Sequence, residues 1–288
     1  MSLRPRYILT FQCPDQVGIV AAVTSLTASF NGWIVEAAQH ADRDTGLFFM
    51  RQEILVESVP FGADELRDRF APIAERFDMT WNLRDPAQQH RVMLFCSKQD
   101  HCIADLLHRW KTEDLKFDPC GVVSNHNDLR PLTEYHGVPY HHVPVSKDPD
   151  EKAAAFAEME NICANADAET IVLARYMQIM PPKLCETYDG RMLNIHHSFL
   201  PSFVGAKPYH QAFERGVKLI GATCHYVTSE LDAGPIIEQD VIRVTHAHDP
   251  DEMVRRGRDV ERLVLTAGVR AHLEDRVMRF GNKTVVFS

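Results

Sequence analysis

Three side chains of the types that act on an acyl carbon occur in the second half of the sequence. Asn194 and His196 stand two positions apart, and Asp232 follows in the segment Leu231-Asp232-Ala233-Gly234-Pro235. A carboxamide can donate a hydrogen bond to a developing oxyanion, and an imidazole can move a proton near neutral pH. A carboxylate can hold that imidazole and favour its charged form. Since none of the three is a strong nucleophile, we expect attack by water or by a second substrate.

The spacing of Asn194 and His196 indicates that they act together. Residues two apart in a strand point to the same face. The run 191–196 reads as a short strand, and Pro201 ends this pattern. For any single Asn or His, the alternative is a strand end whose polar groups only cap a loop. The combined pattern favours a reactive site at the end of this strand.

The segment from Asn194 to Gln239 resembles the folate-dependent formyltransferase superfamily. In that superfamily an Asn-x-His strand end and an Asp-x-Gly-Pro turn form the site that handles the formyl group. The resemblance covers almost the whole chain and is closer still to the formyltetrahydrofolate deformylase family. The further segments that carry it are Asp100-His101-Cys102, 124–130 (SNHNDLR), 173–180 (LARYMQIM) and 205–212 (GAKPYHQA).

The resemblance implies a hydrolase that converts 10-formyltetrahydrofolate and water to formate and tetrahydrofolate, within one-carbon and purine metabolism. Asn194 would polarise the formyl oxygen, His196 would stabilise the intermediate and shuttle protons, and Asp232 would orient water and pair with His196. The implied substrate-binding residues are Met177, Gln178, Ile179 and Met180 around the pterin, with His225 and Lys207 as further candidates. Alternatively, His225 is a core histidine on its strand and Lys207 is a solvated charge on a loop.

Two other functions stay open at this point. One is formyl transfer to an unidentified small amine, and the other is a catalytically silent amino-acid sensor. A ribotide acceptor is disfavoured by the segment 97–102 (SKQDHC), which stands where purine-pathway transferases of the superfamily carry a glycine-rich phosphate loop. This segment has no glycine and carries Asp100, which would repel a phosphate.

The composition of the chain narrows its class. At 288 residues with 45% hydrophobic and 25% charged content, the chain is long enough for two globular domains. The net charge of −9 argues against nucleic acid or an anionic membrane as the main partner. Seven cysteines without a Cys-x-x-Cys pair favour a reducing cytoplasm. The fifteen histidines show no zinc-binding spacing, so we expect no metal and no cofactor beside the folate substrate.

The first 84 residues read as a small ferredoxin-like domain with the order βαββαβ. Apolar spacing predicts a helix that begins after the turn at 15–18 and ends at Asn31-Gly32, with Gly32 in the left-handed conformation. In the second helix, Pro72 is expected to cause a kink or a restart.

This pattern resembles the ACT family of amino-acid-sensing domains. The resemblance implies an amino-acid site formed by Asp15, Gln16, Val17 and Gly18 at the seam of a homo-oligomer, a dimer or a tetramer. Glycine and methionine are the candidate effectors, since both belong to one-carbon metabolism. A purely structural pairing module is the equal alternative.

A polar segment, 85–90, is the predicted linker to a second domain at 91–288. In this domain short apolar strands alternate with helical stripes, which predicts a Rossmann-like, mostly parallel, doubly wound sheet. The expected strands cover 92–96, 120–124, 141–145, 170–174, 192–196, 220–227 and 235–244. Active sites of such sheets lie beyond the carboxyl ends of the strands, where Asn194 and His196 fall.

Overall fold

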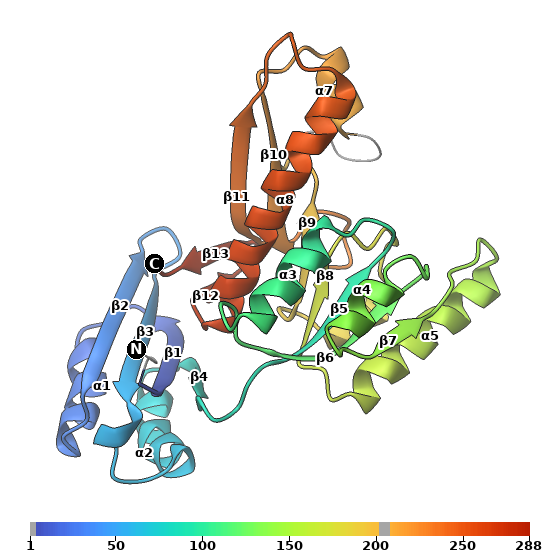
Figure 1. Ribbon diagram of the computed structural model, residues 1–288. Coiled ribbons are helices and arrows are strands. Elements are labelled where there is room, and N and C mark those ends of the chain that lie inside the picture. The colour runs from blue at the N-terminus through green and yellow to red at the C-terminus, as the bar shows by residue number, and fades with distance from the viewer. Residues whose placement is uncertain (1–3, 202–207) are drawn as a thin grey trace. The chain divides into compact units, whose positions relative to one another are not determined.

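The computed structural model describes residues 4–201 and 208–288 (Figure 1). The chain forms two compact units, which divide between Gln89 and His90. Residues 274–280 and 285–288 also belong to the first unit, and residues 281–284 belong to the second. Among the described residues, no helix is both long enough and apolar enough to cross a bilayer.

The first unit contains an antiparallel sheet whose strands lie in the order β2-β3-β1-β4. Its elements are β1 (Arg6–Pro14), α1 (Ile19–Ser29), β2 (Ile34–Asp42), β3 (Leu47–Leu55), η1 (Val56–Ser58), α2 (Ala63–Arg76) and β4 (Thr80–Arg84). Alternate residues of β1 are buried, and Leu9 and Phe11 pack in one core with Val23 of α1 and Phe70 of α2. The predicted βαββαβ order is confirmed.

Strand β3 is buried on both faces of this sheet. Met50 packs into the core beneath the helices, whereas the ring of Phe49 lies 5.0 Å from the ring of Phe280. The guanidinium of Arg51 donates to the carbonyl oxygens of Glu274 and Asp275, at 2.9 and 3.2 Å. The C-terminal segment therefore covers part of the sheet face opposite the helices, which no pattern in the sequence indicated.

In this unit the prediction for the end of α1 was wrong, and the helix restart predicted at Pro72 does not occur. Asn31, with φ 58°, takes the left-handed conformation that was expected of Gly32. A Cβ on Gly32 would lie 2.4 Å from the ring of Phe30, so this glycine is needed for a close approach instead. Helix α2 is one element that runs through Pro72, because the packing of its apolar face outweighs the loss of a single N–H donor. The kink that was expected at Pro72 as the alternative to a restart stays a prediction.

The second unit contains a seven-stranded sheet in the order β11-β10-β9-β8-β5-β6-β7 (Figure 1). Strands β5 to β9 pair in parallel, and β10 and β11 are antiparallel. The strands are β5 (Arg91–Cys96), β6 (Asp118–Ser124), β7 (Tyr140–His142), β8 (Thr170–Leu173), β9 (Met192–His196), β10 (Leu219–Tyr226) and β11 (Ile236–Arg243). The helices are α3 (His101–Lys111), α4 (Arg130–Tyr135), α5 (Pro149–Asn165), α6 (Pro182–Thr187), α7 (Pro208–Glu214) and α8 (Pro250–Leu273). A separate two-stranded sheet joins β12 (Val277–Phe280) and β13 (Lys283–Val286).

Both faces of the central strands are buried, which explains their unbroken apolar runs. Met93 and Phe95 of β5 share a core with Met159 of α5 and Leu184 of α6. Leu94 lies between them in the strand and is 1% exposed, and strand alternation points it to the opposite face. The predicted α/β, mostly parallel fold is confirmed, and the loops after β5, β8 and β9 lie at one edge of the sheet.

Candidate active site

Strand pairing brings three of the predicted site residues to neighbouring positions. Asn194 and His196 lie on one face of β9, and Ile195 between them is buried. Strand β10 runs antiparallel to β9 with His225 opposite Asn194. A register irregularity in the pairing of β10 with β11 falls at His225, and such bulges often re-aim side chains beside active sites.

His225 fixes the orientation of the Asn194 amide. The Nδ1 atom of His225 lies 2.8 Å from the carbonyl oxygen of Tyr226, which can only accept, so Nδ1 carries the hydrogen. In the neutral ring, Nε2 then accepts from the Asn194 Nδ2 atom at 3.2 Å. This contact uses one N–H of the amide and leaves the second N–H for a bound ligand.

Asp232 reaches the same two imidazoles from the loop after β10. Its Oδ2 lies 3.2 Å from His196 Nδ1, and its Oδ1 lies 3.7 Å from His225 Nε2. Burial by itself would raise the pKa of the Asp232 carboxyl. The hydrogen bond and charge of His196 outweigh burial and hold this pKa well below its ordinary value. The carboxylate is therefore ionised at neutral pH.

The turn that presents Asp232 has two backbone requirements. Asp232 itself has φ 54°, a left-handed conformation that Asp tolerates better than most residues. A Cβ on Gly234 would lie 1.8 Å from the carbonyl oxygen of Tyr226, so only glycine lets the turn lie this close to β10. The Asp-x-Gly-Pro pattern is thus a device for positioning a carboxylate.

His196 combines burial with an unused ring nitrogen. The residue is 5% exposed, and its Nδ1 faces Asp232. Its Nε2 is buried and has no hydrogen-bond partner within the described chain, which is uncommon for a buried polar atom. Because His196 lines a cavity, this nitrogen can exchange a proton with a molecule bound there.

The cavity has a volume of about 560 Å³ and is lined by the loops after β8 and β10, by β9 and by α8. All four residues predicted around the pterin, Met177 to Met180, lie on its wall. The side chains of Met177 and Ile179 are 54% and 61% exposed, which suits an apolar contact with a planar ring. The backbone N–H of Met177 is already bound by Ser97 Oγ at 3.0 Å. Lys207, the remaining candidate, lies outside the described residues.

A second polar cluster lies on the cavity wall. The Glu261 side chain is 1% exposed; its carboxylate accepts from His101 Nε2 at 2.8 Å and from the Tyr209 hydroxyl at 2.6 Å, and it pairs with Arg175 Nε at 3.2 Å. Burial would raise the pKa of Glu261, but the His101 hydrogen bond and the Arg175 charge lower it. Burial, with the Arg175 charge, lowers the pKa of neighbouring His197 to about 3. The cluster therefore holds an ionised carboxylate beside a neutral imidazole.

Sequence reasoning did not assign a role to this cluster. Three of its members, His101, Arg175 and Tyr209, lie in segments that carry the family resemblance. The fourth, Glu261, is a charged residue on the apolar stripe of α8 beside Val260 and Val264. Such a residue requires partners when buried. Those partners come from the starts of α3 and α7 and the end of β8, which only the tertiary fold brings together.

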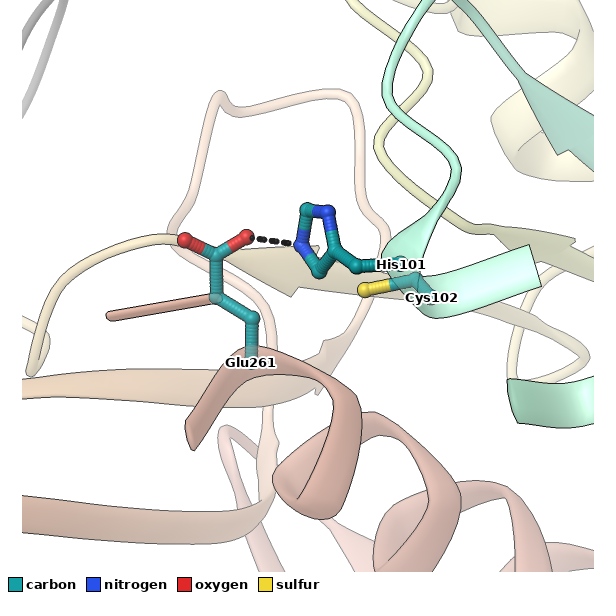
Figure 2. A group of neighbouring side chains, drawn as sticks. All are labelled: His101, Cys102 and Glu261. Carbon is teal, nitrogen blue, oxygen red and sulfur yellow. Dashed lines mark hydrogen bonds and ion pairs between the residues drawn. The ribbon is translucent and has the colours of Figure 1, made fainter. Parts of the chain in front are cut away.

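Glu261 also lies beside His101 and Cys102 (Figure 2). The atoms of these three side chains that could bind a metal lie within 4.8 Å of one another. These residue types can bind a metal. However, the carboxylate is already engaged by an imidazole, a phenol and a guanidinium, and burial raises the pKa of the Cys102 thiol well above its ordinary value. Hydrogen bonding accounts for the group better than coordination does, and the expectation of no metal stays a prediction.

The four residues of the predicted effector site form the turn between β1 and α1. The N–H of Asp15 donates to the Gly46 carbonyl oxygen at 2.8 Å. Gly18, with φ 98°, occupies the N-cap position of α1, and no side chain caps this helix. All four residues are exposed, and Val17 is fully so. The turn was predicted correctly, and the effector itself stays a prediction.

The chain matches known proteins along its whole length. Residues 90–269 match the formyl transferase family. A formyltetrahydrofolate deformylase of Corynebacterium sp. (strain P-1) is 48% identical, over 99% of this chain and 99% of the relative. A crystal structure of a formyltetrahydrofolate deformylase from Pseudomonas syringae pv. tomato str. DC3000 has a TM-score of 0.98 and 58% identity, covering 100% of this chain and 96% of that chain.

The shorter glycinamide ribonucleotide transformylase 1 from Symbiobacterium toebii is also similar, with a TM-score of 0.67 and 25% identity. The match covers 72% of this chain and 98% of that chain. The deformylases, by contrast, match over both compact units. This chain therefore belongs to the formyl transferase family and, within it, to the formyltetrahydrofolate deformylases.

Proposed function

We propose that this protein hydrolyses 10-formyltetrahydrofolate to formate and tetrahydrofolate. The observation that carries the proposal is the connected set of Asn194, His196 and Asp232 on the wall of one cavity, in a chain of the deformylase family. An amide donor, a general base and a carboxylate partner suffice for attack of water on a formamide.

The proposal gives each residue one step. The second N–H of Asn194 donates to the formyl oxygen as negative charge develops there. His196 Nε2 takes a proton from the attacking water, and Asp232 stabilises the imidazolium at Nδ1. The C–O bond forms, the C–N10 bond breaks, and His196 returns the proton to N10. His225 contributes by holding the Asn194 amide in place.

The test is a formate-release assay on the purified protein with 10-formyltetrahydrofolate. We expect one formate and one tetrahydrofolate for each substrate consumed, and the same yield when small amines are added. A formylated amine in place of formate would identify a transferase. No turnover at any amino-acid concentration would support a silent sensor and overturn the proposal. Activity should also survive prolonged chelation, because the proposed steps need only hydrogen bonds and proton transfer.

We further propose that the first unit assembles the protein into a homo-oligomer and binds an amino acid such as glycine or methionine. Strand β2 is an edge strand of nine residues that is mostly exposed, and Trp33 beside it is 67% exposed. Unpaired edges and exposed apolar groups favour association. Light scattering that showed a monomer would exclude assembly, and formate release unaffected by a panel of amino acids would exclude an effector.

The proposed setting is a reducing cytoplasm, since all seven cysteines are free and six of them are buried. The reaction as written needs no organic cofactor, because the folate is the substrate.

A further inference from the structure

Arg175 has a backbone conformation that its side-chain type does not favour. Its φ of 64° lies in the left-handed region, where residues with a Cβ are strained and glycine is not. The residue follows the end of β8 and lines the cavity. Strained residues of this kind cluster at functional sites. An arginine at a glycine-favouring position therefore directs attention to what its side chain does.

The Arg175 side chain is largely buried, and most of its N–H donors are unpaired within the described residues. The side chain is 10% exposed, and within residues 4–201 and 208–288 its one ionic partner is Glu261, through Nε. A guanidinium carries five N–H donors, so the two Nη groups keep theirs for another acceptor. Nothing else in the described chain pairs with those groups.

Glu261 can hold the Arg175 side chain in position without occupying all of its N–H donors. His101 and Tyr209 bind the carboxylate from α3 and α7 and fix its position. The Tyr209 ring is itself fixed, because a Cβ on Gly257 of α8 would lie 2.2 Å from its Cζ atom. Because Nε is the guanidinium nitrogen that pairs with this fixed carboxylate, the two Nη groups are left for another acceptor.

The reaction creates the anion that such a group would bind. A formamide is neutral, whereas its hydrolysis product formate carries a negative charge on two oxygens. Planar guanidinium groups bind carboxylates through two parallel N–H···O bonds. His197 is neutral in this part of the cavity, and Arg258, the other arginine on the wall, is exposed.

We propose that Arg175 binds the formate produced in the cavity through its Nη groups, and that Glu261 is the positioning residue that holds it there. This inference rests on the proposed function, since it names the product that the site must hold and release. The glutamate tail of the folate also carries carboxylates, so the experiment has to separate the two sources.

The central test compares wild type with Arg175→Gly, Arg175→Lys and Glu261→Gln. Titration with ¹³C-formate, followed by NMR, reports binding whether or not the enzyme turns over. We expect Arg175→Gly to weaken formate binding and product inhibition by about 10- to 100-fold, the scale of a lost charge-assisted contact. Arg175→Lys keeps the charge without the planar fork and should fall between, as should Glu261→Gln. Arg258→Ala, the control, should bind formate as wild type does.

Folding is checked on the same variants by thermal unfolding. Arg175→Gly relieves the strained backbone but leaves the buried Glu261 carboxylate without its cationic partner. Formate binding is therefore compared only among variants that are folded at the assay temperature, where weakened binding reflects the lost guanidinium. If this variant fails to fold, Arg175→Lys and Glu261→Gln still report on the contact. Equal formate affinity in wild type and all folded Arg175 variants would overturn the proposal.

A truncated substrate, 10-formyltetrahydropteroate, separates the two carboxylates. If Arg175 binds the glutamate tail, Arg175→Gly will raise KM only for the substrate that carries glutamate, with formate inhibition unchanged. That result would overturn the assignment to formate. If wild type releases no formate but binds it through Arg175, the proposed function fails while the anion site stands.

Discussion

At the scale of single residues, Asn194 and His196 carry separate parts of the chemistry and should fail separately. Asn194→Ala removes one oxyanion donor and should lower kcat/KM about 10²–10³-fold. His196→Ala removes proton transfer and should lower it about 10²–10⁴-fold. Formate release measures both effects, with circular dichroism to show that each variant is folded. Near-normal activity in a folded variant would remove the role assigned to that residue.

Asp232 should contribute to the catalytic rate through its negative charge. Its pKa is held below the ordinary value by His196, so it stays ionised across the working range. Asp232→Asn retains the shape and suits the left-handed backbone but loses the charge that stabilises the His196 cation. We expect a loss of roughly 10²–10⁴-fold in kcat, on the scale of other neutralised carboxylate–histidine pairs. The rate is to be measured from pH 5 to 9; an unchanged rate and profile would disprove the coupling.

The residues that sequence reasoning found are those whose relation is local. Asn194 and His196 share a strand face, and Asp232 lies in a recognisable turn. His225 was a secondary candidate, because its contact with Asn194 depends on the register of β9 against β10. Arg175 and Glu261 come together only in the folded chain, and no spacing pattern in the sequence indicates that they pair.

At the scale of elements, strand β9 was predicted to within one residue of its observed bounds, because a short apolar run is flanked there by turns. The short helices α4 and α6 were not predicted, since six residues do not establish a helical period. The left-handed residue after α1 was assigned to Gly32 instead of Asn31. Sequence alone does not show that the ring of Phe30 lies where a Cβ on Gly32 would fall.

The turn after β10 supports a prediction at this scale. Gly234→Ala would bring a methyl group into the Tyr226 carbonyl oxygen, so the turn must shift and carry Asp232 away from His196. We expect a loss of about 1–3 kcal/mol in the free energy of unfolding, together with lower activity. Gly62→Ala is the control, because its Cβ would meet nothing within 4 Å. Chemical denaturation and formate release measure the two effects, and a Gly234→Ala protein equal to the control would contradict this account.

At the scale of the whole molecule, the sequence predicted two α/β units from a change in the pattern of elements. It did not predict that residues 274–280 and 285–288 join the first unit. The reason lies in the partners of two β3 side chains. Arg51 donates to the carbonyl oxygens of Glu274 and Asp275, and the ring of Phe49 packs against the ring of Phe280. A polar and an aromatic residue on a sheet face do not reveal which distant segment will cover them.

The stability of the second unit should depend on pH in a direction set by its buried groups. His197 has a folded pKa of about 3 against an ordinary 6.5. Between these values the unfolded chain binds a proton that the folded chain does not, so the free energy of unfolding rises with pH. The slope from one such group is at most about 1.4 kcal/mol per pH unit. Asp232 and Glu261, whose pKa values are lowered, add the same sign below pH ~4, because their ionised forms stabilise the fold.

His197→Asn separates these contributions. The variant should show a shallower rise of stability between pH 4 and 6.5 and keep the part below it, because it removes one imidazole and leaves both carboxylates. The slope that remains in this window belongs to His136 and His141, whose pKa values burial also lowers. Urea unfolding at half-unit steps from pH 3 to 8 measures the change. A variant whose stability varies with pH as steeply as wild type across that window would show that His197 takes up its proton equally in the folded and the unfolded chain, and that its burial does not lower its pKa.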